Sequence, residues 1–357
     1  MTEENIKLNG LFYNSENLDE LFMKDTAAES WQNAIHSFLK NWFDDSDVVI
    51  TYTSGSTGKP KEIRLAKRAM RNSAEMTNQF FGLNAESTVL LCLPASYIAG
   101  KMMLVRAIVG GFNLITVEPS SNPFEKLDSK IDFAAITPYQ LNYSAETLKT
   151  KPVQNIIVGG GHVNSKLEAI AQSIPANMFE TYGMTETCSH IALRQFNGKE
   201  KSDYFTVLDG VSIRLDERNC LVIIAPHLNE NEIVTNDFVD ISIENSFRWL
   251  GRFDATINTG GVKIHPEQIE KKLEGIIPAN FFISFLPDQV LENKVILVIE
   301  SETYSGQQLE ILKLQIQSRL TKYELPKQLF FLKKFIYSQS NKLLRKETMK
   351  LLSITDL

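Results

Sequence analysis

The chain of 357 residues has few cysteines, no long apolar run and no excess of positive charge. Its three cysteines, Cys92, Cys188 and Cys220, are widely spaced, which argues against a disulfide framework or a paired-cysteine metal site and fits a reducing compartment. No apolar run reaches the roughly 20 residues that a membrane-spanning helix needs, and residues 1–10 lack the apolar core of a signal peptide. The net charge of −6 argues against general nucleic-acid binding. We therefore expect a cytoplasmic protein with no nucleic-acid or membrane partner.

The proportions of apolar and charged residues are ordinary for a globular protein. Hydrophobic residues make up 43% of the chain and charged residues 22%. A chain of this length is long enough for two or three domains, each with its own core. It contains no internal repeat, low-complexity tract or long block of charge.

Short apolar runs alternate with helical patterns over the first two-thirds of the chain. Apolar strands separated by helices indicate a mainly parallel sheet that is covered on both faces. In such a sheet the ligand crevice lies at the carboxyl ends of the strands. The expected strands are 89–93, 114–117, 133–136 and 156–158, and the expected helices are 67–81, 99–109, 138–148 and 165–172.

The pattern changes after about Asp209. Residues 211–215 and 221–224 flank a polar turn and indicate a hairpin in a small β unit. Beyond Asp254, a helix at 266–273, strands at 281–286 and 295–299 and a helical apolar face from Leu309 to Leu320 indicate a compact α+β domain. For the amphipathic helix around Trp31–Trp42 we expect a packing role only.

The sequence therefore predicts an α/β fold in two domains. The large domain, residues 1–252, has a mainly parallel sheet flanked by helices, plus a small β subdomain. The smaller C-terminal domain, residues 253–357, is α+β and mobile.

Residues 53–61, with the sequence TSGSTGKPK, begin three positions after Ile50, the last residue of an apolar run. Glycines let the backbone turn tightly and bring its N–H groups close to a ligand, and the hydroxyls and lysines add donors and positive charge. The segment therefore suits a polyphosphate. It differs from the P-loop, which has four residues between its glycines and Ser or Thr after its Lys. Because Pro60 disfavours a helix at Lys59, we expect this loop between two strands, the second at 62–66; a solvated Ser/Gly linker is the alternative.

A second informative cluster is the segment 182–186, with the sequence YGMTE. Gly183 permits close backbone approach, Tyr182 offers a flat face for a purine, and Glu186 offers a hard oxygen ligand for Mg²⁺. Alone the cluster is a weak signal, since Thr185 could equally serve as an ordinary helix N-cap.

Together these two segments resemble the adenylate-forming superfamily, which includes acyl-CoA synthetases, aryl-CoA ligases, luciferases and peptide-synthetase adenylation domains. The TSGSTGKPK string is highly specific for that superfamily. Further signatures follow in the family's order, and the resemblance extends over residues 47–350. They lie at 93–100, 159–161, 182–186, Asp237, 251–254, 260–261 and 340–345.

The resemblance implies ATP and Mg²⁺ as cofactors and coenzyme A as a substrate. Lys342 would bridge the substrate carboxylate and the α-phosphate, Thr185 would lie near the α-phosphate, and Glu186 would hold Mg²⁺. Asp254 would be the hinge about which the C-terminal domain rotates before thioester formation, and residues 259–264 would then face the pantetheine tunnel. The implied ATP-binding residues are Thr53, Ser54, Gly55, Ser56, Thr57, Gly58, Lys59, Gly160, Gly161, Thr181, Tyr182, Gly183, Asp237 and Arg252.

Elementary electrostatics supports these roles. A carboxylate that attacks a polyphosphate meets like-charge repulsion, so the site must supply cations, and Lys59, Mg²⁺ and Lys342 would do so. Each assignment has an ordinary alternative. Asp237 and Arg252 could be a surface ion pair, and Lys342 could be one cation of a basic terminal helix.

The chain departs from the family pattern in four places. Tyr97 replaces the usual His, Asn236 replaces Gly before Asp237, and Asn341 replaces Gly before Lys342. The largest departure is length, because the phosphate loop begins at residue 53 rather than well over a hundred residues into the chain. We expect one wall of the usual acyl pocket to be rebuilt or to come from another subunit, and a homo-oligomer is compatible with this.

Within the superfamily, the short form and the segment 97–106 are similar to the o-succinylbenzoate–CoA ligases of menaquinone biosynthesis. This resemblance implies an acyl-substrate pocket lined by Tyr97, Lys101 and Arg106, in which Lys101 first, or else Arg106, pairs with the non-reacting benzoate carboxylate. A solvent-facing Lys101 is the alternative. Three other functions remain open: another aryl- or short-acyl-CoA ligase, an adenylation module that loads a carrier protein, and a non-catalytic nucleotide-binding relative.

Overall fold

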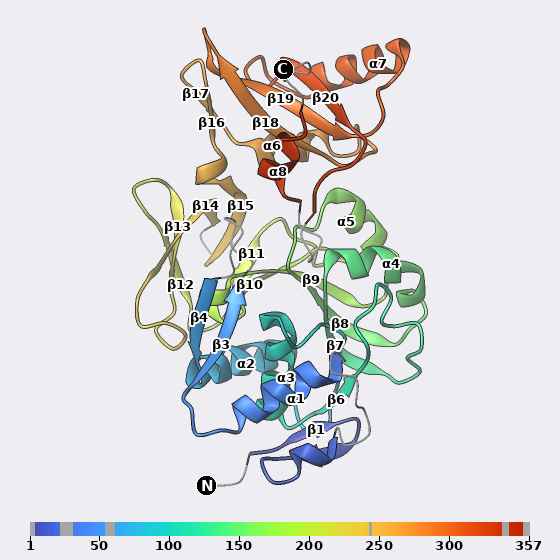
Figure 1. The fold of residues 1–357 in the computed structure, drawn as a ribbon, viewed down its shortest axis with the longest axis vertical. Coiled ribbons are helices and arrows are strands. Elements are labelled where there is room, and N and C mark those ends of the chain that lie inside the picture. Colours follow the sequence, from blue (N-terminus) through green and yellow to red (C-terminus); the bar gives the residue numbers. More distant parts are fainter. Residues whose placement is uncertain (1–3, 22–30, 54–60, 243–244, 338–342, 353–357) are drawn as a thin grey trace.

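The computed structural model describes residues 4–21, 31–53, 61–242, 245–337 and 343–352. These residues form a large α/β part and a smaller α+β part that stands at one end of it (Figure 1). The N-terminal strands lie at the opposite end of the molecule from the smaller part.

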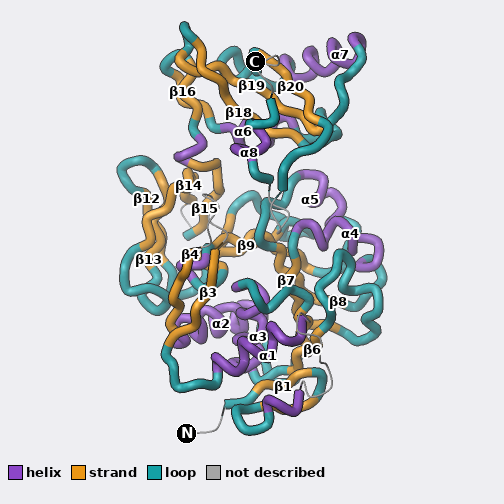
Figure 2. The backbone as a smooth tube through the Cα atoms, in the orientation of Figure 1, coloured by secondary structure: helices purple, strands orange, loops and turns teal. Residues whose placement is uncertain are grey.

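One mixed sheet of 13 strands runs through the large part (Figure 2). Its one half, from β1 to β9, is parallel apart from the edge strand β2, and the half from β9 to β12 is antiparallel. In spatial order the strands are β12 (Ser212–Leu215), β13 (Cys220–Ile224), β14 (Ile233–Ser242), β15 (Ser246–Arg252), β11 (Phe205–Val207), β10 (His190–Gln195), β9 (Asn177–Gly183), β8 (Val153–Val158), β7 (Ile131–Ile136), β5 (Thr88–Leu91), β6 (Asn113–Thr116), β1 (Ile6–Leu8) and β2 (Leu11–Tyr13).

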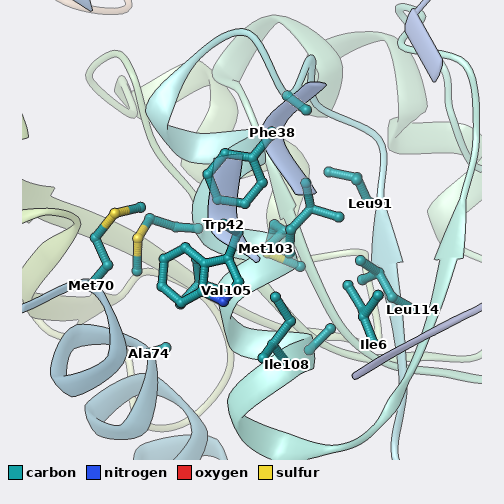
Figure 3. Packing of buried hydrophobic residues seen from close by; sticks show 14 of the residues in the cluster. Ile6, Phe38, Trp42, Met70, Ala74, Leu91, Met103, Val105, Ile108 and Leu114 are labelled. Atoms are coloured by element: carbon teal, nitrogen blue, oxygen red, sulfur yellow. The ribbon is translucent and has the colours of Figure 1, made fainter. Parts of the chain in front are cut away.

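Helices cover both faces of the parallel half, as the apolar strands predict. Alternate residues of a strand point to opposite faces, and in β5 Val89 and Leu91 join one core while Leu90 joins the other. The first core contains buried residues of α1 (Trp31–Trp42), α2 (Lys67–Phe81) and α3 (Ile98–Gly110), and Figure 3 shows how its side chains pack around Trp42. The second core is covered by α4 (Pro138–Leu148) and α5 (Ser165–Ala171).

The helix boundaries follow from local sequence. The predictions of 67–81 and 138–148 are confirmed to the residue, and those for α3 and α5 are off by one residue. Thr137 and Gln140 form a capping box at the start of α4, and Gly82 closes α2 in the left-handed conformation. The predicted packing role of α1 is confirmed by its buried face, which includes Phe38 and Trp42.

The small β unit expected after Asp209 belongs to the main sheet. Strand β11 joins β10 on one side and β15 on the other, so the hairpin β12–β13 continues the same surface through β14 and β15. The parallel half is as predicted, and the β unit extends it with antiparallel strands, so the complete sheet is mixed. Pairing of β11 with strands distant in sequence is a tertiary choice that hydrophobic periodicity does not encode.

Two further strands, β3 (Val48–Thr53) and β4 (Lys61–Ala66), pair only with each other among the described residues. Thr53 is the register partner of Lys61. The predicted position of the phosphate loop, between two strands, is therefore confirmed.

The smaller part has its own elements and its own cores. Its hydrophobic clusters contain only residues from Ile257 onwards, which supports our proposed division at 252/253. Gly260 and Gly261, with φ of +57° and +80°, form the tight turn between β16 and β17. The elements are β16 (Ile257–Thr259), β17 (Val262–Ile264), α6 (Pro266–Leu273), β18 (Phe281–Asp288), β19 (Glu292–Glu300), α7 (Gly306–Gln317), β20 (Gln328–Leu332) and α8 (Arg345–Met349).

Candidate active site

Asp237 on β14 is a buried carboxylate, 7% exposed, in a fixed set of hydrogen bonds. Tyr182 Oη donates to Oδ2 at 2.7 Å, and Trp249 Nε1 donates to Oδ1 at 3.2 Å. Burial, followed by the charge of Asp237, raises the pKa of Tyr182, so this hydroxyl stays protonated and keeps donating. Each carboxylate oxygen can accept more than one hydrogen bond, so capacity remains for a pair of hydroxyl groups.

A β-bulge in β15 brings Trp249 and Arg252 to the same face of the sheet as Asp237. Asp237 pairs with Arg252 and Phe238 with Gly251, but Val239 pairs with Trp249, so Leu250 is an extra residue. Positions three apart in a regular strand point to opposite faces. The extra residue turns Trp249 and Arg252 toward the same side, and the Arg252 guanidinium lies 3.6 Å from Asp237 Oδ1.

Arg252 also makes two hydrogen bonds to Asp254, at 3.0 and 3.1 Å. The bond to Asp254, and after it the charge of Asp237, outweigh burial and raise the pKa of Arg252. Arg252 therefore bridges the buried carboxylate and the residue at the start of the smaller part. Ribose support by Arg252 and the hinge at Asp254 remain proposals.

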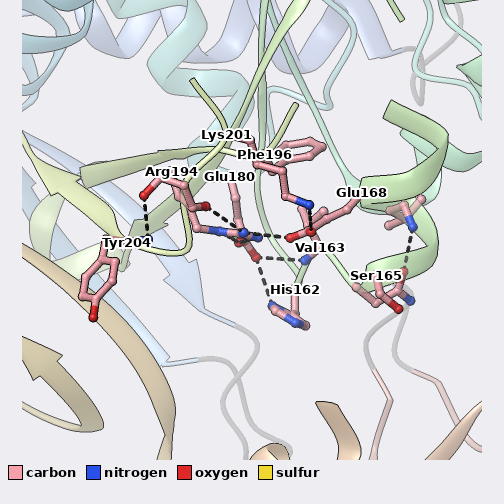
Figure 4. Close-up of polar contacts among 12 residues, drawn as sticks. His162, Val163, Ser165, Glu168, Glu180, Arg194, Phe196, Lys201 and Tyr204 are labelled. Carbon is pink, nitrogen blue, oxygen red and sulfur yellow. Dashed lines mark hydrogen bonds and ion pairs between the residues drawn. The ribbon is translucent and has the colours of Figure 1, made fainter. Parts of the chain in front are cut away.

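Two residues before Tyr182, Glu180 of β9 is 4% exposed and lies at the centre of an ionic network (Figure 4). Its Oε2 accepts from Arg194 Nε and Nη2 at 2.9 and 2.7 Å, and its Oε1 accepts from the Val163 N–H at 2.8 Å. His162 Nδ1 lies 3.1 Å from the same Oε1. Burial raises the pKa of Glu180, but His162, Arg194 and the Val163 N–H outweigh it, so the net shift is downward and Glu180 is ionised.

Two of the four glycines of the site, Gly159 and Gly183, stand where a side chain would collide. A Cβ on Gly159 would lie 2.5 Å from Thr181 Oγ1, and one on Gly183 would lie 2.3 Å from the Ser189 carbonyl oxygen. Gly160 has φ of +80°, and a Cβ on it or on Gly161 meets little or nothing. Because β8 and β9 are parallel neighbours, the segment 159–161 and residues 181–183 lie side by side at the carboxyl ends of the strands, as the sequence predicts.

Thr185 and Glu186 lie on a short 3-10 turn, Thr185–Thr187, directly after β9. The hydroxyl that fixes this turn is that of Thr187, which accepts from the Met184 N–H at 3.0 Å and lies 2.6 Å from the Ser189 carbonyl oxygen. The N-cap alternative for Thr185 is therefore wrong, because Thr187 makes these bonds. Glu186 is exposed and forms no ion pair with another described residue.

Cys188 closes this turn with φ of +61° and ψ of −42°. The Ser189 N–H donates to the Thr187 carbonyl at 2.7 Å, which is the hydrogen bond of a γ-turn in its rare, strained form. This turn directs the Ser189 hydroxyl toward α3, where it meets the Arg106 guanidinium at 2.6 Å.

Arg106 on α3 is 2% exposed. Its Nη1 contacts Met103 Sδ at 3.4 Å, its Nε has no partner, and it forms no ion pair with any described carboxylate. Burial lowers the pKa of Arg106 to about 9. Lys101 instead donates to the Ile50 carbonyl at 3.2 Å, and Tyr97, just before α3, is 47% exposed.

Several predicted site residues lie outside the described residues. Of the phosphate loop only Thr53 is described, as the last residue of β3. The roles of these residues and of the catalytic lysine therefore stay predictions. They are Ser54, Gly55, Ser56, Thr57, Gly58, Lys59 and Lys342.

The donor set suits a magnesium ion that arrives with phosphates. Among the described residues no group of three or more His, Cys, Asp or Glu side chains could hold a metal. Mg²⁺ commonly takes one or two carboxylates together with substrate phosphate oxygens and water. Glu186 could supply that single carboxylate, and bound Mg²⁺ would neutralise the phosphate charge.

Sequence reasoning missed four residues that organise this site: His162, Glu180, Arg194 and Trp249. Glu180 carried a usable signal, since an acid between Phe179 and Thr181 in a buried strand needs a partner. Arg194 carried the corresponding signal, because a basic residue in the apolar strand β10 also needs a partner of opposite charge. The contact between them could not be read from one sequence.

Comparisons with known proteins agree with this fold. The profile of the AMP-binding enzyme family matches residues 7–220. A Dyadobacter fermentans protein, described as acyl-CoA synthetase (AMP-forming)/AMP-acid ligase II-like, is 35% identical with a TM-score of 0.61, and the match covers 92% of this chain and 97% of that one. A 2-succinylbenzoate–CoA ligase from Bacillus cereus is 26% identical over 341 residues, 85% of this chain and 70% of the relative. O-succinylbenzoate coenzyme A synthetase from Bacillus subtilis, in complex with ATP and a magnesium ion, shares the fold with a TM-score of 0.70, at 22% identity over 84% of this chain and 69% of that chain.

The fold and the family match define an adenylate-forming enzyme of the α/β class. The chain belongs to the AMP-binding enzyme family. Its general activity is that of an AMP-forming acid–CoA ligase.

No helix in the described ranges combines the length and the apolar character needed to cross a membrane.

Proposed function

We propose that this enzyme activates 2-succinylbenzoate with ATP to the acyl adenylate and pyrophosphate, and then transfers the acyl group to coenzyme A. The observation that carries the choice of a diacid is Arg106. A buried cation without a counter-ion is costly, and Arg106 has neither an ion-pair partner among the described residues nor a partner for its Nε. A second carboxylate on the substrate would supply both.

The same observation changes which of the two cations on α3 we assign to the non-reacting carboxylate. Lys101 stood first in our interpretation of the sequence, but its Nζ already donates to the Ile50 carbonyl. Arg106 lies beside Ser189, three residues after the proposed magnesium ligand Glu186. We therefore assign the non-reacting carboxylate to Arg106, with the Ser189 hydroxyl holding the guanidinium in place.

Acid-dependent pyrophosphate exchange, followed by addition of coenzyme A, tests the reaction. The matched substrates are 2-succinylbenzoate and 4-oxo-4-phenylbutanoate, which lacks only the ring carboxyl. We expect the diacid to be preferred in kcat/KM by about tenfold or more, the value of a charge-assisted hydrogen bond. Exchange with other acids only would point to a different acyl-CoA ligase, and adenylate formation without transfer to free coenzyme A would point to a carrier-loading module.

Two variants of α3 test the cation. Arg106→Met should abolish the diacid preference and retain the fold, because it removes an unpaired buried charge, whereas Lys101→Met should keep the preference. Loss of the preference in Lys101→Met alone would return the assignment to Lys101.

A further inference from the structure

His162 follows the triple glycine 159–161 and is set apart from the other residues of the ionic network by its exposure. Its side chain is 56% exposed, whereas those of Glu180 and Arg194 are 5% and 6% exposed. One ring nitrogen, Nδ1, faces Glu180, and the other, Nε2, makes no hydrogen bond to a described residue. Figure 4 shows the ring at the outer edge of the network.

The network fixes the tautomer of this imidazole. Glu180 is ionised and accepts from Arg194 and from the Val163 N–H, so the His162 Nδ1 beside it must carry a proton and donate. In the neutral ring Nε2 is then an acceptor, with its lone pair directed away from the protein core. A hydrogen-bond acceptor that is held in this fixed orientation is suited to bind an N–H group of a ligand.

A row of contacts leads from His162 to the proposed ribose acceptor. The His162 and Trp249 rings are 6.2 Å apart, and Trp249 Nε1 donates to Asp237. A nucleoside with its ribose hydroxyls at Asp237 and its base against Tyr182 and the glycines would extend along this row. The far edge of its purine would then lie at His162.

We propose that His162 is a specificity residue for the nucleotide, whose neutral Nε2 accepts a hydrogen bond from the 6-amino group of adenine. A 6-oxo purine presents an acceptor at the same position and is disfavoured. This inference rests on the proposed function for the presence of ATP, but not on which acid is activated.

Protonation of His162 reverses the polarity of Nε2. The groups that face the ring are Glu180 on β9, Arg194 on β10, Trp249 on β15 and Glu274 after α6. Burial lowers the pKa of His162, but Glu180 and then Glu274 outweigh burial and the repulsion from Arg194, so the net shift is upward. Because only the neutral ring accepts, recognition of the amino group should be lost in acid and should strengthen as the pH rises through that raised pKa.

The test measures dissociation constants of two nucleotides directly, without an acid substrate. The probes are ATP and purine riboside 5′-triphosphate, which lacks only the 6-amino group, each with Mg²⁺. His162→Asn is the decisive variant, because its amide nitrogen can still donate to Glu180 while the outward nitrogen is missing. His36→Gln, on α1, is the control.

We expect the preference for ATP over the purine analogue to fall about tenfold in His162→Asn, the value of one good hydrogen bond. It should rise with pH in the wild-type enzyme and in His36→Gln, and stay flat in His162→Asn. An unchanged preference in a folded His162→Asn variant would overturn the inference. The proposed function is decided separately, by acid-dependent pyrophosphate exchange.

Discussion

Asp237 shows how one side chain can be tested against a nearly identical neighbour. Asp237 and Asp240 lie on β14, and each has a tyrosine hydroxyl and an arginine as partners: Tyr182 and Arg252 for the first, Tyr204 and Arg248 for the second. Of the two, only Asp237 is proposed to contact the nucleotide. Asp237→Asn should weaken binding of ATP about tenfold or more, since the loss affects hydrogen bonds to a charged group, and Asp240→Asn should leave it unchanged. Equal losses in the two variants, measured by equilibrium binding, would contradict the ribose assignment.

Glu180 is the residue on which we expect stability to depend most. Replacing one partner of a buried ion pair leaves the other charge uncompensated, at a cost of about 3–5 kcal/mol. Glu180→Gln should therefore lower the free energy of unfolding by about that amount, whereas Glu168→Gln, at the more exposed end of the Arg194 network, should cost less. Urea unfolding measures both variants, and a smaller loss for Glu180 than for Glu168 would refute the network's importance.

The pH dependence of this network has a definite sign. The folded-state pKa of Glu180 is lowered from 4.5, so its contribution to stability is present above 4.5 and is lost as the pH falls through the lowered value. His162 has a raised pKa, so its contribution is present below 6.5 and is lost as the pH rises through the raised value. Urea midpoints should therefore fall in acid for the wild type, and Glu180→Gln should flatten that acid limb.

Among the elements, the strained turn at Cys188 is the sharpest local constraint. A β-branched residue at positive φ is strongly disfavoured, so Cys188→Val should cost about 2 kcal/mol or more in the free energy of unfolding. Cys220 is equally buried but lies in β13, where a branched side chain is suited to the backbone. Cys220→Val is therefore the control and should cost clearly less. Similar costs for the two variants would mean that the turn stores no strain.

At the same scale, the sequence predicted helices far better than strand partners. The limits of α2, α4 and α6 follow from periodicity with Pro138, Pro266 and Gly82 as signals within a few residues. The attachment of β11 to both β10 and β15 follows from long-range packing and was missed. In the site, Tyr182 and Asp237 were found through family motifs, but His162 and Trp249 belong to no motif and their roles depend on contacts across the sheet.

For the whole molecule, several contacts near the site join the two parts. The Ser165 N–H donates to Glu274 at 2.9 Å, and the rings of Phe238 and His265 are 4.6 Å apart. The rotation about Asp254 that the family resemblance implies would have to break both contacts.

The proposed rotation predicts a separation of the two half-reactions. Lys342→Ala should abolish acid-dependent pyrophosphate release while sparing thioester formation from a supplied acyl adenylate, because each half-reaction would use a different face of the smaller part. Lys346→Ala, an exposed lysine of α8, is the control. Equal loss of both half-reactions in Lys342→Ala would refute the rotation.

The bulge at Leu250 decides which face of β15 carries Trp249 and Arg252. The two residues are three positions apart, so simple alternation would place them on opposite faces, and the extra residue brings both to Asp237. Deleting Leu250 would leave them two positions apart in a regular ladder, and therefore still on one face. We expect the deletion variant to fold and to bind ATP, as Leu250→Ala should. A strand pattern with a strict period of two therefore assigns one of these two side chains to the wrong face.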